Sequence, residues 1–204
     1  MAVIPQRTIS QFKSKLVGGG VRPNLFEVQV NFPDNVDLGI QQDGGGEFDG
    51  DRFRFLCKAA SLPASNVGNI DIPFRGRTLK VAGDRTVDDW SVTVINDEDF
   101  GHRRAFEAWA QNIAQYGDSS GLTDPASYMG NATVYQLGRN IASRQGSNSP
   151  ATDSDILAQY KMVDIWPTTV DALELSYDTG DTIQEFGDTF KVQYYYPERA
   201  GAGA

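Results

Sequence analysis

Residues 90–113 read WSVTVINDEDFGHRRAFEAWAQNI, and this stretch predicts a strand followed at once by a helix. Trp90, Val92 and Val94 alternate with small polar residues, which is the two-residue period of a strand with one buried face. After the acidic residues 97–99 the period changes, and apolar side chains recur three or four positions apart, on one side of a helix. The predicted core residues of the stretch are Trp90, Phe106, Trp109 and Ile113.

Further strands are predicted on both sides of this stretch. Phe26, Val28, Val30 and Phe32 alternate with polar residues, and Pro33 ends the run. Residues 52–62 are interpreted as a strand with Phe53, Phe55 and Cys57 on one face. Other expected strands are 67–74, 77–81, 133–137, 157–166 (ended by Pro167), 173–177 and 190–196.

About eight strands and one substantial helix indicate a mainly β fold, an antiparallel β-sandwich or partial barrel with one flanking α-helix. No repeat of fixed period and no linker divides the chain. We therefore expect an N-terminal arm over residues 1–23, a single domain over 24–197 and a flexible tail over 198–204.

Composition excludes several classes of protein. The formal net charge of −9 disfavours a protein that reads DNA sequence, because such proteins present a basic face to phosphate. The single cysteine, Cys57, leaves no intrachain disulfide, which favours folding in the cytoplasm. We expect no secretory signal in residues 1–20, and no apolar run approaches the ~18–20 residues that span a bilayer.

Charge is unevenly distributed along the chain. The arm contains four basic residues and no acidic one, whereas residues 33–51 contain six acids and residues 163–190 seven, with no base in either segment. An ordinary solvated surface explains this pattern, and so does a basic arm that docks on an acidic surface of another copy. The candidates for contacts between subunits or rings are Arg7, Lys13, Lys15 and Arg22.

Candidate catalytic and metal sites are weak. His102 is the only histidine, and no Gly-x-Ser-x-Gly motif accompanies it, so we expect a structural histidine at the edge of the helix's buried stripe. The acids 97–99 are expected to cap the helix and to occupy its first turn. Residues 44–51 contain oxygens that could meet calcium, but without EF-hand spacing, and a solvated loop is the simpler interpretation. We predict no cofactor, no metal and no enzymatic activity.

One block of sequence resembles a known family. It runs from Phe74 to Phe100, with a Gly-Arg strand, the Gly-Asp-Arg-Thr turn of residues 83–86, a Trp strand and Asn-Asp-Glu-Asp, and it leads to Phe106-Glu107-Ala108-Trp109. This block resembles the tail-tube proteins of contractile-tailed, myovirus-type bacteriophages. Residues 57–63 and 160–167 look like flanking parts of the same family, and the likeness covers most of residues 24–196.

The resemblance implies a structural protein of the virion without catalytic residues. Six copies would close into a ring, each contributing strands to one continuous barrel, and rings would stack into a tube inside a contractile sheath. Implied partners are the protein itself, the sheath, baseplate and tape-measure proteins, and DNA that passes through the lumen without sequence-specific binding. Two alternatives stay open: the tube subunit of a type VI secretion system or tailocin, and a calcium-dependent carbohydrate-binding β-sandwich.

Two strands offer a polar face that could line such a lumen. When one face of a strand is apolar and buried, the other meets solvent, a partner or a channel. On these two strands that second face lacks Lys and Arg, which would otherwise bind phosphate. The lumen-facing candidates are Glu27, Gln29, Asn31, Asp89, Ser91 and Thr93.

Overall fold

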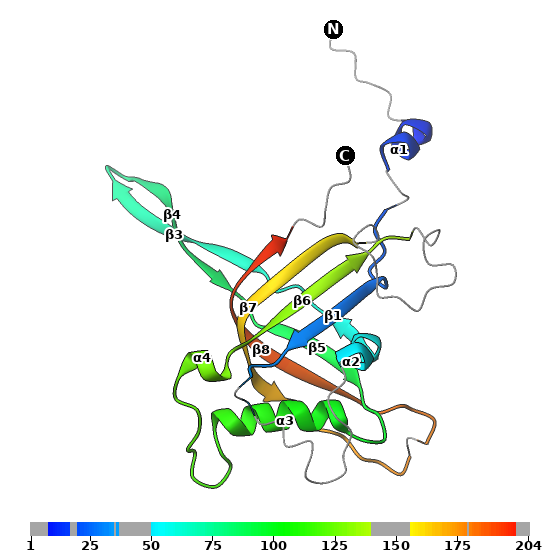
Figure 1. Cartoon of the computed structure of the whole chain (residues 1–204). Helices are drawn as coiled ribbons and strands as arrows, with labels where there is room; N and C mark the ends of the chain where they lie inside the picture. The colour runs from blue at the N-terminus through cyan, green and yellow to red at the C-terminus, as the bar shows by residue number, and fades with distance from the viewer. Residues whose placement is uncertain are drawn as a thin grey trace.

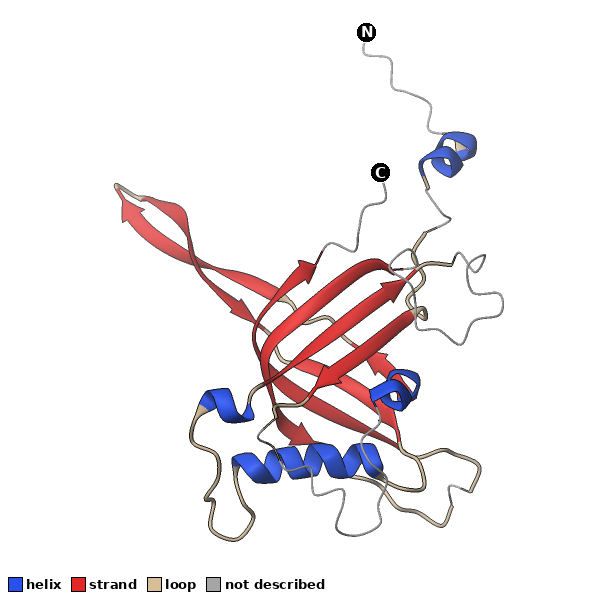
Figure 2. Cartoon of the chain, in the orientation of Figure 1, coloured by secondary structure: helices blue, strands red, loops and turns tan. Residues whose placement is uncertain are grey.

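The computed structural model describes residues 8–16, 20–34, 36, 50–139, 156–178 and 180–198. Strands dominate the described part, and helices lie at its periphery (Figures 1 and 2). The elements are α1 (Ile9–Lys15), β1 (Phe26–Asn31), α2 (Gly50–Leu56), β2 (Cys57–Ala60), β3 (Ser65–Phe74), β4 (Arg77–Val87), β5 (Trp90–Ile95), α3 (Gly101–Ile113), α4 (Pro125–Tyr128), β6 (Gly130–Leu137), β7 (Ile156–Val170) and β8 (Glu185–Glu198).

Six antiparallel strands form one sheet in the order β1-β6-β7-β8-β5-β2. The sheet curls until its edge strands β1 and β2 approach each other, and α2 packs against both edges. We call this curled sheet the barrel. Strands β3 and β4 form a separate two-stranded ribbon that projects away from the barrel (Figure 1). The expected mainly β, barrel-like fold is therefore confirmed.

The core fills the inside of the barrel. Val28 and Val30 of β1 are buried, and so are Trp90, Val92 and Val94 of β5, as the two-residue period predicts. Phe186, Phe190 and Val192 of β8 complete this side of the core. Alternation is thus a sound guide to the buried face of β1, β5 and the first half of β8.

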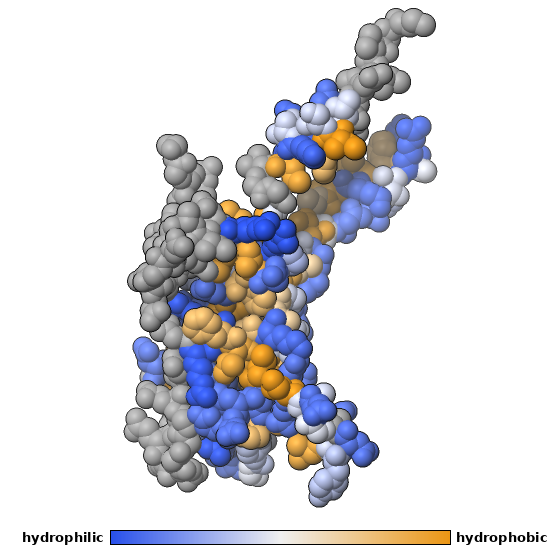
Figure 3. Space-filling view, turned by 90° about the vertical axis from the view of Figure 1, so that its right-hand side faces the viewer, coloured by the Kyte–Doolittle hydropathy of each residue, from blue (hydrophilic) through white to orange (hydrophobic). Residues whose placement is uncertain are grey.

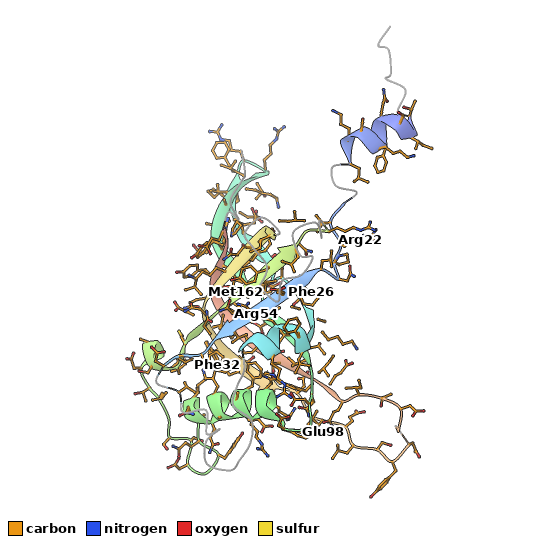
Figure 4. The ribbon with its side chains drawn as sticks, turned by 45° about the vertical axis from the view of Figure 1, so that its right-hand side comes forward. Arg22, Phe26, Phe32, Arg54, Glu98 and Met162 are labelled. Atoms are coloured by element: carbon orange, nitrogen blue, oxygen red, sulfur yellow. The ribbon has the colours of Figure 1, made fainter. Side chains whose placement is uncertain are left out.

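Helix α3 closes one end of the barrel with an aromatic cluster. Trp109 and Phe106 are fully buried, and Ile113 packs against the core while partly exposed. The Trp109 ring lies 5.0 Å from Phe32 and 6.0 Å from Phe190, and its Nε1 donates a hydrogen bond to the Tyr128 carbonyl at 2.7 Å. Figure 4 shows Phe32 reaching from the end of β1 toward this helix.

Trp109→Ala is expected to lower the free energy of unfolding by ~3–5 kcal/mol. The substitution leaves a cavity among rings that are held on three separate elements, and it leaves the Tyr128 carbonyl without its donor. Urea denaturation measures the change. Phe55→Ala is the control, because Phe55 is 83% exposed and its loss should cost little. Equal midpoints for Trp109→Ala and the parent would contradict this packing role.

Two sequence predictions around residues 50–100 are wrong. Residues 50–56 form a helix, so Phe53 and Cys57 face the core while Phe55 points to solvent. The acids 97–99 do not enter the first turn of α3, whose N-cap is Phe100 with a φ of 55° and no side-chain cap. Asp97 and Asp99 instead form ion pairs with Arg52, at 2.7 and 2.8 Å, and so tie α2 to the loop before α3.

The C-terminal half differs from expectation at a proline and in a loop. β7 continues through Pro167 to Val170, because a break in register between Pro167 and Thr169 accommodates the missing N–H. Residues 173–177 form no strand and belong to the long β7–β8 connection. Arg7, most of residues 44–51 and residues 199–204 lie outside the described residues, so the calcium and tail predictions for them stay predictions.

Candidate assembly surface

The β3–β4 ribbon is built as a tight hairpin. Its two-residue turn consists of Arg75 and Gly76, both with positive φ (45° and 82°), which suits the right-handed twist of the two strands. Ile70 pairs with Val81 and Ile72 with Leu79. Directly paired residues point to the same side of a ribbon, and so do residues two apart, so these four side chains share one face with Phe74.

This apolar face of the ribbon is open to solvent in the single chain. Its exposed fractions run from 41% to 67%: Ile70 53%, Ile72 45%, Phe74 67%, Leu79 60% and Val81 41%. The opposite face is polar, where Asp71 accepts a hydrogen bond from Asn69 and lies 3.8 Å from Lys80. The ribbon is therefore amphipathic, and its apolar face stays largely exposed among the residues that the structure describes.

An isolated two-stranded ribbon with an apolar face is unstable in water by itself. Contiguous exposed apolar residues of this kind mark surfaces that contact another protein. We therefore regard the ribbon, Ser65–Val87, as the principal candidate assembly surface. The sequence pattern predicted most of the strand residues of the ribbon but not its protrusion. A two-residue period shows that one face is apolar, but not which surface that face packs against.

A second apolar surface lies at the open end of the barrel. Here a hollow of about 490 Å³ separates the start of β1 from the residues after β2. Val21 and Leu62, 62% and 46% exposed, lie on its two sides, and Leu157 is 54% exposed. Nearby on β8, the stacked rings of Tyr194 and Tyr196 continue the inward face of the strand beyond the core. Both surfaces lie away from α3.

The predicted lumen residues lie on the outward faces of two different parts of the barrel. β1 carries Glu27, Gln29 and Asn31, whereas Asp89, Ser91 and Thr93 belong to the β5 side. β2 separates these strands in one direction, and β6, β7 and β8 separate them in the other. The two sets therefore lie on separate outward faces of the barrel of one subunit.

Basic groups approach both of these polar faces from neighbouring elements. Lys191 of β8 forms an ion pair with Asp89, and Lys58 of β2 forms one with Glu185. On the β1 side, Arg54 donates a hydrogen bond to Gln29 at 2.7 Å. Each of the two predicted strand faces lacks Lys and Arg among its own residues. The basic side chains beside these faces come from other strands and from α2, which are distant in the sequence.

The predicted arm residues are partly described. Lys13 and Lys15 lie in the last turn of α1, and Arg22 is exposed just before β1, with its carbonyl accepting a hydrogen bond from Gln136. Helix α1 was not predicted from the sequence. A signal was present: Thr8 and Gln11 form a capping box, and apolar residues follow three and four positions apart.

The described residues offer neither a metal-binding cluster nor an activated cysteine. No group of three or more His, Cys, Asp or Glu residues within it could hold a metal ion. Burial raises the pKa of the Cys57 thiol to about 12, so this thiol stays protonated and unreactive at neutral pH. His102 is 3% exposed and packs edge-on against Phe53. No described helix is long and apolar enough to cross a membrane.

A family model described as phage tail tube protein matches residues 21–198, which include the ribbon and the whole barrel. The chain belongs to this family. It is 33% identical over 178 residues to tail tube protein gp19 of Enterobacteria phage T4, covering 87% of this chain and 92% of the relative. The protein of phage T6 matches equally, and the tail tube protein of Serratia phage KSP90 is 23% identical over 193 residues.

Solved structures share the tail tube fold. The sheath–tube complex of the extracellular contractile injection system PVC contains a chain with a TM-score of 0.56 and 11% identity, with 95% of this chain and 99% of that chain covered. The baseplate of the anti-feeding prophage contains one with a TM-score of 0.59 and 9% identity, covering 90% and 98%. The resemblance stated from residues 74–109 is thus confirmed, and the chain is a structural tail tube subunit located in the virion tail.

Proposed function

We propose that six copies of this tail tube protein close into a ring and that rings stack into the tube. The observation that carries the proposal is the apolar face of the β3–β4 ribbon, which is largely exposed to solvent in the described part of the single chain. A ribbon that extends from one copy onto the barrel of the next makes a head-to-tail contact, and such contacts close into rings when the rotation fits. Closure also covers the apolar hollow at the open end of the barrel.

The partners follow from this assembly. The tube would lie inside a contractile sheath and rest on a baseplate, would enclose the tape-measure protein during assembly and would conduct DNA during ejection. Two fold relatives come from a sheath–tube complex and a baseplate, which supports the first two partners. The protein would have no enzymatic role. Phage relatives at 33% identity favour a phage tail over a bacterial injection machine.

Of the two polar faces, we assign the lumen to that of Asp89, Ser91 and Thr93. The β1 face is partly covered already, since Gln29 is half-buried and Thr133, its cross-strand neighbour, is 7% exposed. On the β5 side Asp89 and Ser91 are exposed, and the nearby lysines are neutralised by Asp89 and Glu185. A wall without net positive charge lets DNA pass without binding phosphate.

Electron cryo-microscopy of tubes formed by the purified chain tests the proposal. We expect rings of six subunits, with each ribbon on a neighbouring copy and Asp89 facing the channel while Glu27 does not. Failure to form rings or tubes under any condition in which the subunit is folded would overturn the assembly proposal. Glu27 at the channel with Asp89 outside would overturn the lumen assignment alone.

A further inference from the structure

Helix α1 carries an apolar stripe that is exposed along its whole length. Ile9, Phe12 and Leu16 are three and four positions apart and are 77%, 65% and 44% exposed. No residue of the helix is buried. The helix stands apart from the barrel (Figure 1), and Figure 3 shows apolar surface on it. A seven-residue helix is too short to persist in water alone, so it needs a surface to pack on.

Basic residues border this stripe. Lys13 is four positions after Ile9, and Lys15 is three positions after Phe12, so each lysine neighbours an apolar side chain on the helix surface. The whole arm contains no acidic residue. A surface that fits α1 therefore offers an apolar floor with an acidic rim.

The β7–β8 connection, residues 171–184, has this composition. It contains a hollow of about 470 Å³ whose lining includes Glu174, Leu175 and Tyr177. Leu175 is 85% exposed and Tyr177 fully exposed, so apolar surface is available there. The connection contains four acids and no base. Among the described residues, the carboxylates of Glu174, Asp178 and Asp181 take part in no ion pair.

The two features lie at opposite ends of the subunit. In Figure 1, α1 is above the barrel and the β7–β8 connection extends below it, beside α3. Figure 4, seen from a second direction, shows the same separation. The arm of one copy thus cannot meet the β7–β8 connection of the same copy, whereas in a stack of identically oriented rings the top of one subunit faces the bottom of the next.

We propose that α1 of a subunit in one ring docks in the β7–β8 hollow of a subunit in the adjacent ring. Ile9, Phe12 and Leu16 cover Leu175 and Tyr177, and Lys13 and Lys15 meet Glu174 and Asp178. This contact rests on the proposed tube and specifies how its rings adhere. Lateral closure of each ring uses the ribbon, so ring closure and ring stacking depend on separate surfaces.

A charge exchange tests the contact in the full-length protein. The arm variant is Lys13→Glu with Lys15→Glu, the loop variant is Glu174→Lys with Asp178→Lys, and the third variant combines all four. The combined variant has the parent's net charge, so it separates pairing from bulk repulsion. A control variant, called the decoy, combines the arm variant with Asp34→Lys and Asp118→Lys. These two exposed acids lie outside the β7–β8 connection, so the decoy has the parent's net charge without restoring the proposed pairs. Tube length by microscopy and the critical concentration for tube growth are the measurements.

We expect the arm and loop variants each to form rings but to raise the critical concentration for tubes by about tenfold or more, because six contacts act together at every junction. The combined variant should recover parental tubes, and the decoy should not. Parental stacking in the arm or loop variant, or recovery by the decoy, would overturn the proposal. Loss of rings in the arm variant would overturn it as well. If the parent itself forms no rings, the proposed function fails, and the docking contact with it.

Discussion

Leu79→Asp should abolish tube formation while leaving the subunit folded. Leu79 lies in the middle of the ribbon's apolar face, opposite Ile72, and is 60% exposed in the single chain. The substitution removes little packing from the subunit, so the free energy of unfolding should change by less than ~1 kcal/mol. In the proposed ring it would bury an unpaired carboxylate at every contact between neighbours, six times per ring.

Thr78→Asp is the matched control. Thr78 is the adjacent residue, is also exposed and points to the opposite, polar face of the ribbon. It adds the same charge at nearly the same place, so assembly should persist in this variant. Light scattering and negative-stain microscopy report assembly, and circular dichroism reports folding. Tubes formed by Leu79→Asp, or equal loss of tubes in both variants, would show that the apolar face is not the contact.

Asp188 is expected to make the subunit less stable as the pH rises from about 4 to about 8. Its side chain points into the core from β8, is 1% exposed, and neither carboxylate oxygen has a hydrogen-bond partner. Burial raises its pKa from an ordinary value of 3.8 to about 8. The positive charge of Arg103 on α3 opposes this rise, whereas the carboxylates of Asp171 and Glu107 add to it.

The direction of the effect follows from proton uptake. Between pH 4 and pH 8 the folded chain holds a proton on Asp188 that the unfolded chain has released, so stability falls as pH rises. Below pH 4 both states are protonated, and above pH 8 both are ionised, so the contribution is constant there. A pKa difference of about four units corresponds to roughly 5 kcal/mol across this window.

Asp188→Asn should remove this dependence. The amide has nearly the same shape and does not titrate, so the variant should gain stability relative to the parent as pH rises, by several kcal/mol between pH 5 and pH 8. Urea denaturation in the non-assembling Leu79→Asp background measures this difference without interference from tubes. Asp84→Asn, at an exposed aspartate of β4, serves as the control and should follow the parent. A constant difference between Asp188→Asn and the parent across this range would contradict a protonated Asp188.

Local patterns predicted the elements that face the barrel interior. Val28 and Val30, like Trp90 and Val92, alternate with polar residues because one side of each strand contacts the core. The same reasoning failed at residues 50–56, where Phe53 and Phe55 lie two apart in a helix that points one inward and the other to solvent. A short run that mixes aromatic and charged residues fits either period, and contact with both barrel edges selects the helix.

The amino-acid sequence by itself determined the strand faces, the buried stripe of α3, the negative charge and the family, because each of these is written in neighbouring residues. Only the tertiary structure decided that the Ile72 face of the ribbon stays exposed in the described part of the subunit, that Lys191 pairs with Asp89, and that Glu27 and Asp89 lie on separate faces of the barrel. These features depend on which distant strands become neighbours. That choice is made by closure of the whole sheet, which is a long-range property that no local period encodes.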